Sequence, residues 1–285
     1  MTWNPIQMRC TPISAGCANC WHLQFAKRHA GNPTFNKQKR AAYAGGKPRV
    51  DINEHSAPSR RKKSSMIAVM FMGDLFHESI MDTQIGGVFG CMEGSPRHTF
   101  LVLTKRAERM MRWVTEWKKK IDYMADHPAP QEGLYLKRYG HIWLGVSVED
   151  QAAADERIPL LLQTPAAIRW VSVEPMLGPV DLRGQAKGYG FGWIDWVVCG
   201  AETGLHKRPC NPEWTDSLRG QCTAAGVPFF GKVDQDGNPI EPRQMPGGIP
   251  QTKSEQPKKR CPYGCEFDPK QDPYHIEGCA DQNRP

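Results

Sequence analysis

The sequence of 285 residues has no hydrophobic run long enough to cross a bilayer, which excludes a protein anchored by a membrane-spanning helix. Its first residues, MTWNPIQMRC, lack the basic segment and apolar stretch of a secretory signal. We therefore expect a cytoplasmic protein with no membrane partner. Hydrophobic residues make up 39% of the chain, which is enough for one large α/β domain, alone or with a small appendage.

The sequence also lacks an acidic excess. Lysine and arginine number 37 against 30 aspartates and glutamates, so the formal net charge is +7. Much of this excess falls into short basic runs, at 36–40, 45–49, 59–63, 116–120 and 257–260. Each run alone is typical of a solvated surface, but five together indicate contact with a polyanion. Nucleic acid is the partner that we expect.

A fourth cysteine is missing from the loop CTPISAGCANC, which contains Cys10, Cys17 and Cys20. In a reducing cytoplasm, thiols favour metal binding or burial over disulfides. A structural zinc site normally has four ligands, and His22, which could be the fourth, lies only two residues from Cys20. Three cysteines can instead bind three irons of a [4Fe–4S] cluster and leave one iron open. An open iron can chelate S-adenosylmethionine, from which one electron releases a 5′-deoxyadenosyl radical; the sequence favours this cluster over zinc.

A second group of metal-binding residues stands near the end of the chain, with the spacing Cys261-x3-Cys265-x9-His275-x3-Cys279. Four such ligands make a complete tetrahedral set, so we predict a structural zinc module over 261–285. The alternative is a disordered tail with incidental cysteines. The preceding Pro/Gly-rich and basic segment, 238–260, is typical of a linker. The remaining cysteines lie apart in the sequence and are expected in the core or on the surface: Cys91, Cys199, Cys210 and Cys222.

From residue 66 onward, short apolar runs alternate with longer stretches of helical pattern. Such runs, separated by helices, predict a parallel sheet covered by helices. The predicted strands are 66–72, 99–104, 142–148, 168–174, 195–201 and 227–233, with a first strand at the start of the chain, in TWNPI. This fold class is α/β, a complete or partial (β/α) barrel over 1–237. Between the first two strands, a short helix is expected to end at Gly31. The basic segment that follows, at about 32–65, is expected to be an insertion or a loop that becomes ordered on binding.

Polar residues follow the predicted strands. Because the carboxyl ends of barrel strands meet on one rim, these side chains are expected around a single mouth, which the cysteine loop shares. Singly, each could be a helix cap or a loop salt bridge. The polar residues expected at this mouth are Asp74, His77, Glu78, Thr104, Lys105, Arg106, Ser147, Glu149, Asp150, Ser172, Glu174, Glu202, Thr203, Lys232 and Asp234.

An ordered set of motifs resembles a family of phage-encoded three-cysteine proteins related to the radical S-adenosylmethionine (SAM) superfamily. The motifs are TWNPI, CTPISAGCANC, DLFHE, LTKR, WLGVSVEDQ, ERIPLLLQTPA, SVEPMLGPVDL and WVVCGAETG, within residues 2–233. Two features depart from the usual radical SAM loop. Six residues rather than three separate Cys10 from Cys17, and Asn19 stands where an aromatic residue commonly precedes the third cysteine.

The resemblance implies roles for the rim. It implies that S-adenosylmethionine contacts residues after three strands: Gly73, Asp74, Ser147, Glu149 and Glu174. It implies that further groups at the mouth serve catalysis or bind substrate: Lys105, Glu149, Glu174 and Glu202. Arg106 and Lys232 could, like Lys105, pair with a carboxylate or a phosphate.

The function expected from the resemblance and the basic charge is a radical SAM enzyme that acts on nucleic acid. The reaction that fits best is an aminomutase-like isomerisation of an amino-acid adduct on a nucleobase, thymidine in phage DNA, with a flavodoxin or ferredoxin as electron donor. A duplex base would have to be flipped out to reach the mouth. Two alternatives remain: a radical SAM enzyme acting on tRNA or protein, and a nucleic-acid-binding protein with two structural metal sites.

Overall fold

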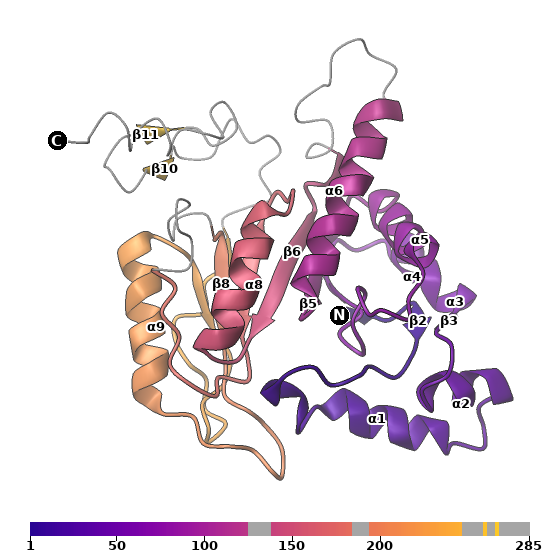
Figure 1. Ribbon diagram of the computed structural model, residues 1–285, viewed down its shortest axis with the longest axis horizontal. Helices are drawn as coiled ribbons and strands as arrows, with labels where there is room; N and C mark the ends of the chain where they lie inside the picture. Colours follow the sequence, from indigo (N-terminus) through magenta and orange to yellow (C-terminus); the bar gives the residue numbers. More distant parts are fainter. Residues whose placement is uncertain (125–137, 184–193, 247–258, 261–265, 268–285) are drawn as a thin grey trace.

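A computed structural model of the chain describes residues 1–124, 138–183, 194–246, 259–260 and 266–267 (Figure 1). Its centre is a parallel sheet of seven strands in the order β1-β4-β5-β6-β7-β8-β9, with β1 and β9 at the edges. The sheet curls into a half-barrel. The strands are β1 (Thr2–Trp3), β4 (Met66–Val69), β5 (Thr99–Thr104), β6 (Ile142–Val148), β7 (Arg169–Val173), β8 (Trp196–Cys199) and β9 (Phe229–Gly231).

All seven predicted strands are confirmed, and the barrel takes the partial form of the predicted fold class. Helices connect most of the strands and lie along the outside of the curl (Figure 1). A large apolar core fills the space between these helices and the outward-facing side chains of the strands. The principal helices are α1 (Trp21–Ala30), α5 (Asp82–Glu93), α6 (Ala107–Met124), α8 (Gln151–Gln163) and α9 (Pro212–Ala225).

The inner face of the half-barrel carries a second, aromatic cluster. Trp143, Trp170 and Trp196 are each at most 4% exposed, and their rings pack with centroids 5.5 Å apart (Trp170–Trp196) and 6.0 Å apart (Trp143–Trp196). Space for this cluster comes from Gly145 on β6, because a Cβ atom there would lie 2.5 Å from the Trp170 ring. The tryptophans therefore fill the interior toward the amino-terminal ends of the strands.

The basic segment 32–65 has secondary structure, so the prediction of a loop is wrong. It contains α2 (Lys37–Tyr43), β3 (Arg49–Val50), α3 (Ile52–His55) and α4 (Ala57–Arg60), and β3 pairs with β2 (Ile6–Gln7). Asn36 caps α2 by accepting a bond from the Lys39 amide at 2.8 Å. The indole of Trp3, fully buried, donates to the carbonyl of Glu54 at 2.8 Å. The segment is thus fastened to the first strand of the sheet.

The predicted linker begins later than expected. Residues 238–244 fold back against β9, with antiparallel bridges from Phe230 to Arg243 and from Val233 to Pro239. Ile240 is buried in the core, so this stretch belongs to the half-barrel. Farther on, the described residues pair as two antiparallel strands, β10 (Lys259–Arg260) and β11 (Glu266–Phe267).

The four predicted zinc ligands, Cys261, Cys265, His275 and Cys279, lie outside the described residues. In the described part of the chain, no helix combines the length and the apolar character that crossing a membrane requires.

The contact between Gly145 and Trp170 predicts how much stability is lost when one methyl group is added at position 145. Gly145→Ala should lower the free energy of unfolding by about 1–3 kcal/mol, because the indole has to move within a filled interior. Gly90→Ala is the matched control: Gly90 lies exposed within α5 with no neighbour that a Cβ would meet, so it should be neutral or stabilising by up to about 1 kcal/mol. Urea unfolding of both variants measures the difference; equal effects would contradict the packing.

Candidate functional site: a three-cysteine pocket

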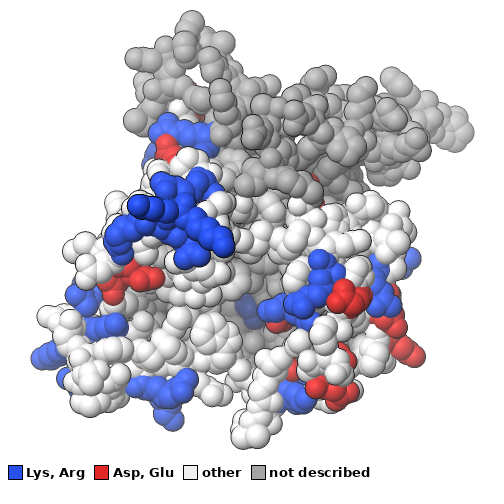
Figure 2. Space-filling view, turned by 180° about the vertical axis from the view of Figure 1, so that it is seen from behind, with Lys and Arg blue, Asp and Glu red and all other residues white. Residues whose placement is uncertain are grey.

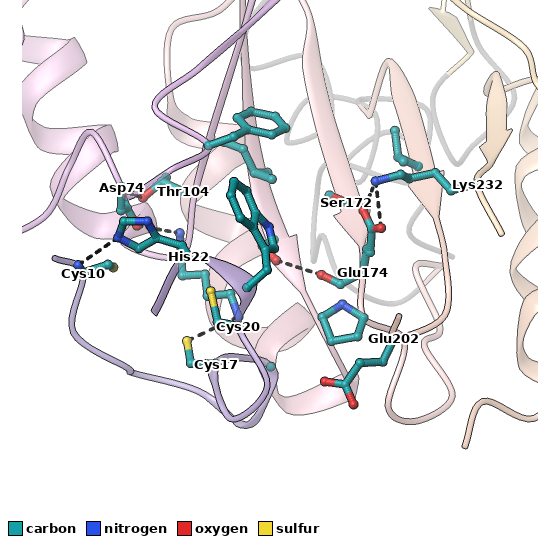
Figure 3. Close-up of a pocket in the computed structure, with 18 of the residues that line it drawn as sticks. Cys10, Cys17, Cys20, His22, Asp74, Thr104, Ser172, Glu174, Glu202 and Lys232 are labelled. Atoms are coloured by element: carbon teal, nitrogen blue, oxygen red, sulfur yellow. Dashed lines mark hydrogen bonds and ion pairs between the residues drawn. The ribbon is translucent and has the colours of Figure 1, made fainter. Parts of the chain in front are cut away.

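A pocket of about 440 Å³ opens at the carboxyl ends of the strands. Cys10, Cys17 and Cys20 line one side of it, and Glu174 and Lys232 line the other (Figure 3). Apolar side chains of the inner face form its floor: Phe71, Leu101, Leu103, Trp170, Trp196, Val198 and Phe230. The sequence therefore predicted correctly that the cysteine loop and the strand ends share one mouth.

The cysteine loop is a series of tight turns between β2 and α1. The amide of Cys17 donates to the carbonyl of Ser14 at 3.0 Å, and the amide of Cys20 donates to the carbonyl of Cys17 at 3.2 Å. Cys20 is the residue that caps α1. The backbone amide of Cys10 donates to Nε2 of the buried His22 at 3.3 Å, so this histidine nitrogen serves the backbone of the loop. Burial and the neighbouring charge of Arg9 lower the pKa of His22 to about 4, which keeps the ring neutral.

The first part of the loop is fastened to the turn after β4. The amide of Thr11 donates to Nε2 of His77 at 3.2 Å, and Arg106 donates to the Thr11 hydroxyl at 3.0 Å. Burial and the nearby Arg106 charge lower the pKa of His77, so its ring can accept this bond at neutral pH.

Asp74 joins the ends of β4 and β5. Its buried carboxylate accepts four hydrogen bonds: from the amides of Phe76 (2.9 Å) and Lys105 (3.2 Å), from the Thr104 hydroxyl (2.7 Å) and from the Arg106 guanidinium (3.1 Å). A carboxylate has about four acceptor positions, and the protein occupies all of them. Asp74 therefore holds the strand ends together, a role that the sequence did not predict.

Glu149 anchors the middle of the loop. Its side chain is 1% exposed and forms ion pairs with Lys105 and, at 3.0 Å, with Arg157. The hydroxyl of Ser14 donates to the same carboxylate at 2.9 Å. Gly16 lies directly against this pair, because a Cβ atom there would come within 2.5 Å of the Glu149 side chain. The predicted binding residue Glu149 thus supports the cysteine loop.

Glu202 anchors the last part of the loop. Arg208 donates to both of its carboxylate oxygens, at 2.5 and 2.8 Å, and also reaches the carbonyl of Ala15 at 2.9 Å. The side chain of Asn19 donates to Glu202 at 3.0 Å. The Arg208 bonds hold the pKa of Glu202 down at about 2. Asn19 therefore ties the residue before the third cysteine to the end of β8.

Two of the three thiols have a cationic side chain beside the sulfur. The Lys105 ammonium lies 3.6 Å from Sγ of Cys17, and the Arg106 guanidinium lies 3.8 Å from Sγ of Cys10. Burial opposes ionisation of Cys17, but backbone hydrogen bonds and Lys105 outweigh it and lower its pKa. At Cys10, burial and the Asp74 carboxylate prevail and raise the pKa to about 11.

The arrangement of the three thiols suits some metal groups and not others. Among the described residues, no three His, Cys, Asp or Glu side chains lie close enough together to hold one ion. A [4Fe–4S] cluster makes a different demand, because each cysteine binds a separate iron. Three thiols on one side of a single pocket, with Lys105 and Arg106 beside two of them, fit that demand.

The accessible polar groups lie opposite the cysteines. The carboxylate of Glu174 and the ammonium of Lys232 are 2.7 Å apart, and their side chains are 28% and 45% exposed. Ser172 lies on the side of Glu174 and Lys232 (Figure 3), and Gly73 and Ser147 also line the pocket. The other predicted site residues that line it are bonded within the protein: Asp74, Thr104, Lys105, Arg106 and Glu202. The buried Glu149 is not among the lining residues.

Sequence reasoning missed several residues that hold the loop: Thr11, Ser14, Arg157 and Arg208. Most are polar residues in irregular segments, and a pattern of strands and helices says nothing about which of them meet. The sequence did contain one signal, the position of Arg157 relative to Glu149. Glu149 follows β6 directly, and Arg157 lies on α8, the next helix along the chain. An arginine there can reach back to the end of the preceding strand.

The fold and the site together define a parallel half-barrel with a three-cysteine loop at the carboxyl ends of its strands. The chain belongs to the protein family of unknown function DUF5131, which matches residues 1–255. No curated protein matches the chain, and no solved structure does.

The pair between Glu202 and Arg208 predicts a pH-dependent loss. Arg208→Gln should lower the free energy of unfolding by about 2 kcal/mol at pH 7, because charged hydrogen bonds to a buried carboxylate are lost. Glu202 has a folded pKa of about 2, below its ordinary value of 4.5, so the contribution is complete above about pH 4.5 and declines as the pH falls toward 2. Urea unfolding of wild type and variant between pH 7 and 3 measures the difference.

Arg183→Gln is the control for this experiment, because Arg183 forms an exposed pair with Asp181, and such pairs contribute little. A difference between wild type and Arg208→Gln that stays constant down to pH 3 would assign the effect to something other than Glu202.

Proposed function

We propose that this protein is a radical SAM enzyme. The observation that carries the proposal is the position of Cys10, Cys17 and Cys20, which line one pocket at the mouth of a parallel half-barrel. A wholly structural metal site does not require such a pocket, with an apolar floor and an accessible pair of charges.

In this proposal the three cysteines hold a [4Fe–4S] cluster. The cluster would supply one electron to bound S-adenosylmethionine, and the cofactor would supply the radical that removes a hydrogen atom from the substrate. Lys105 favours the thiolate of Cys17, and Arg106 offsets part of the burial that disfavours the thiolate of Cys10, since each places a positive charge beside the sulfur. Gly73 and Ser147 line the pocket and are the candidates for contact with S-adenosylmethionine.

The proposed substrate is an amino-acid adduct on a nucleobase, thymidine in phage DNA. The floor of the pocket supports this choice, since Phe71 and Phe230 offer partly exposed aromatic surface to a planar ring. Glu174 and Lys232 are accessible and can orient a charged substituent. An aminomutase-like isomerisation leaves the composition of the adduct unchanged, because the hydrogen removed at the start returns to the product. The base enters the mouth after it is flipped from the duplex.

A basic surface supports contact with DNA. On the face in Figure 2, one large continuous area of Lys and Arg side chains stands beside smaller, separate basic patches. Between α4 and β4, and before β5, a group of exposed basic residues lies together: Arg60, Arg61, Lys62, Lys63 and Arg97. We call this group the basic edge. Because it precedes the first residues of β4 and β5, it lies at the amino-terminal ends of the strands, opposite the pocket.

Two further parts of the proposal concern partners and the end of the chain. The reaction needs one electron, for which a flavodoxin or a ferredoxin is the proposed donor. The spacing of Cys261, Cys265, His275 and Cys279 supports a structural zinc site beside the basic run 257–260.

Iron binding tests the cysteine loop directly. After anaerobic reconstitution with iron and sulfide, the reduced protein should give the EPR signal of a [4Fe–4S]⁺ cluster, and S-adenosylmethionine should change that signal. Cys17→Ala should abolish the signal, because one iron loses its ligand. Cys91→Ala is the control, since Cys91 lies outside the loop and donates to the carbonyl of His55; it should leave the signal intact.

The same preparation distinguishes the alternatives. A protein that carries zinc, takes up no iron and gives no signal would be a nucleic-acid-binding protein without radical chemistry. Where the signal is present, turnover with modified DNA, tRNA and peptide separates the three substrate classes, and activity confined to tRNA or peptide would contradict the proposed DNA substrate.

The basic edge predicts how DNA binding responds to salt. The double variant Lys62→Ala/Lys63→Ala should weaken binding of duplex DNA at low salt and reduce the slope of log K against log salt by about two, because two phosphate contacts are lost. Turnover of a short modified nucleotide should not change, since the edge is remote from the pocket. Arg183→Ala, outside the basic runs and in an exposed pair with Asp181, should leave DNA affinity nearly unchanged. An unchanged slope in the double variant would exclude the edge as the DNA contact.

A further inference from the structure

Four carboxylates stand at the strand ends around the pocket, and three of them are occupied by the protein. Asp74 accepts four hydrogen bonds, Glu149 lies between Lys105 and Arg157, and Glu202 is held by Arg208. At most 6% of each of these three residues is exposed. Glu174 differs from them, since 28% of its side chain is exposed and its cationic partner is exposed still more.

The pair between Glu174 and Lys232 bridges three strands. Nζ of Lys232 lies 2.7 Å from each carboxylate oxygen of Glu174. Glu174 follows β7 and Lys232 follows β9, and Gly200 follows the strand between them, β8. A Cβ atom on Gly200 would lie 3.2 Å from Cβ of Lys232 and 3.4 Å from Oε1 of Glu174. The absence of a side chain at Gly200 thus leaves room for the two charges to meet across β8.

Aromatic side chains lie directly below this pair on the same inner face. Trp170 precedes Glu174 by four residues on β7, and Phe230 precedes Lys232 by two residues on β9, so the alternation of a strand sends all four toward the interior. The ring of Trp196, on β8, connects them, with centroids 5.5 Å from Trp170 and 6.0 Å from Phe230. The rings are tilted against one another, by 38° between Trp170 and Trp196 and by 78° between Trp196 and Phe230. This wall of the pocket is therefore aromatic below and charged toward the mouth.

From this arrangement we infer that Glu174 and Lys232 form the binding subsite for a zwitterionic α-amino-acid group carried by a planar ring. The carboxylate of Glu174 binds the ammonium of the ligand, and the ammonium of Lys232 binds its carboxylate. An ion pair that water reaches opens at little cost, so the ligand can exchange its own charges for the internal pair. The ring of the ligand then lies against the aromatic wall.

The inference deepens the proposed function, on which the identity of the substrate rests, but the binding itself requires no iron. The zwitterion would face the three cysteines across the pocket (Figure 3). Binding of the ammonium by Glu174 would fix the carbon beside it in the pocket, opposite the cysteines where hydrogen abstraction is proposed. The subsite would thereby select the atom that reacts.

Two ligands share this chemistry, because S-adenosylmethionine and an amino-acid adduct of thymidine each combine a zwitterion with a planar base. We assign the subsite to the adduct. The probe is a thymidine whose methyl carbon carries glycine through its nitrogen. Two analogues each lack one charge: the N-acetyl form has no ammonium, and the methyl ester has no carboxylate. Binding of each probe, and of S-adenosylmethionine, is measured by calorimetry on the full chain without iron.

The variants are matched to the charges. Glu174→Gln should weaken binding of the glycine adduct about tenfold or more. It should have little effect on the N-acetyl analogue, because that analogue has no ammonium for the Glu174 carboxylate to bind. Lys232→Met should weaken the adduct similarly and have little effect on the methyl ester. These pairings form double-mutant cycles that separate a direct contact from a general loss of structure. Lys119→Met, in an exposed ion pair on α6, should change no affinity.

Two results would overturn the assignment. If both variants weaken S-adenosylmethionine and leave the adduct unchanged, the pair serves the cofactor and not the substrate. If neither ligand responds, or if each variant weakens all analogues equally, the pair is no subsite. Failure of the radical proposal remains distinguishable, because a protein without an EPR signal that still shows the charge-matched cycles would bind such zwitterions without radical chemistry.

Discussion

The buried carboxylate of Glu149 is the constraint on which the rest of the site depends. A charge that is 1% exposed is costly unless it is paired and hydrogen-bonded, and Lys105, Arg157 and the Ser14 hydroxyl provide that compensation. Lys105 follows β5, Ser14 belongs to the cysteine loop, and Glu149 itself follows β6. The charge of Glu149 therefore fixes the loop against the ends of β5 and β6. Gly16 is needed at the contact, where a side chain would collide with Glu149. The position of Cys17 follows from this pairing.

The rim of the half-barrel consequently has two kinds of charged residue. Asp74, Glu149 and Glu202 are saturated by partners within the protein, and each fastens the cysteine loop or the strand ends that support it. Glu174 and Lys232 are paired but accessible. The loop contributes few apolar side chains of its own, so polar contacts from the ends of β5, β6 and β8 define its shape. A pocket that has to hold three thiols in fixed positions can be built in this way without a larger core.

The strands could be predicted from the sequence because their apolar runs are long and their ends abrupt. The prediction for 142–148 coincides with β6, and that for 99–104 with β5. Segment 32–65 was misread because its helices are short and polar, and it is stabilised by contacts with a distant residue, Trp3. The roles of the rim residues could not be predicted for a related reason. Whether a carboxylate faces a ligand or an arginine depends on the path of the neighbouring loops. The loop after β8, for example, brings Arg208 back to Glu202.

The aromatic cluster separates the two ends of the half-barrel, the basic edge at the amino-terminal ends of the strands and the pocket at their carboxyl ends. Trp143, Trp170 and Trp196 fill the interior below the pocket, so nothing passes along the barrel axis from the basic edge to the mouth. If DNA contacts the basic edge, the strand that carries the modified base has to run along the outside of the molecule to reach the cysteines. Affinity for the polymer and recognition of the modified base then reside in different surfaces, and each can change without the other. Such a division suits an enzyme that finds its substrate by phosphate contacts and identifies it by the charges of one substituent.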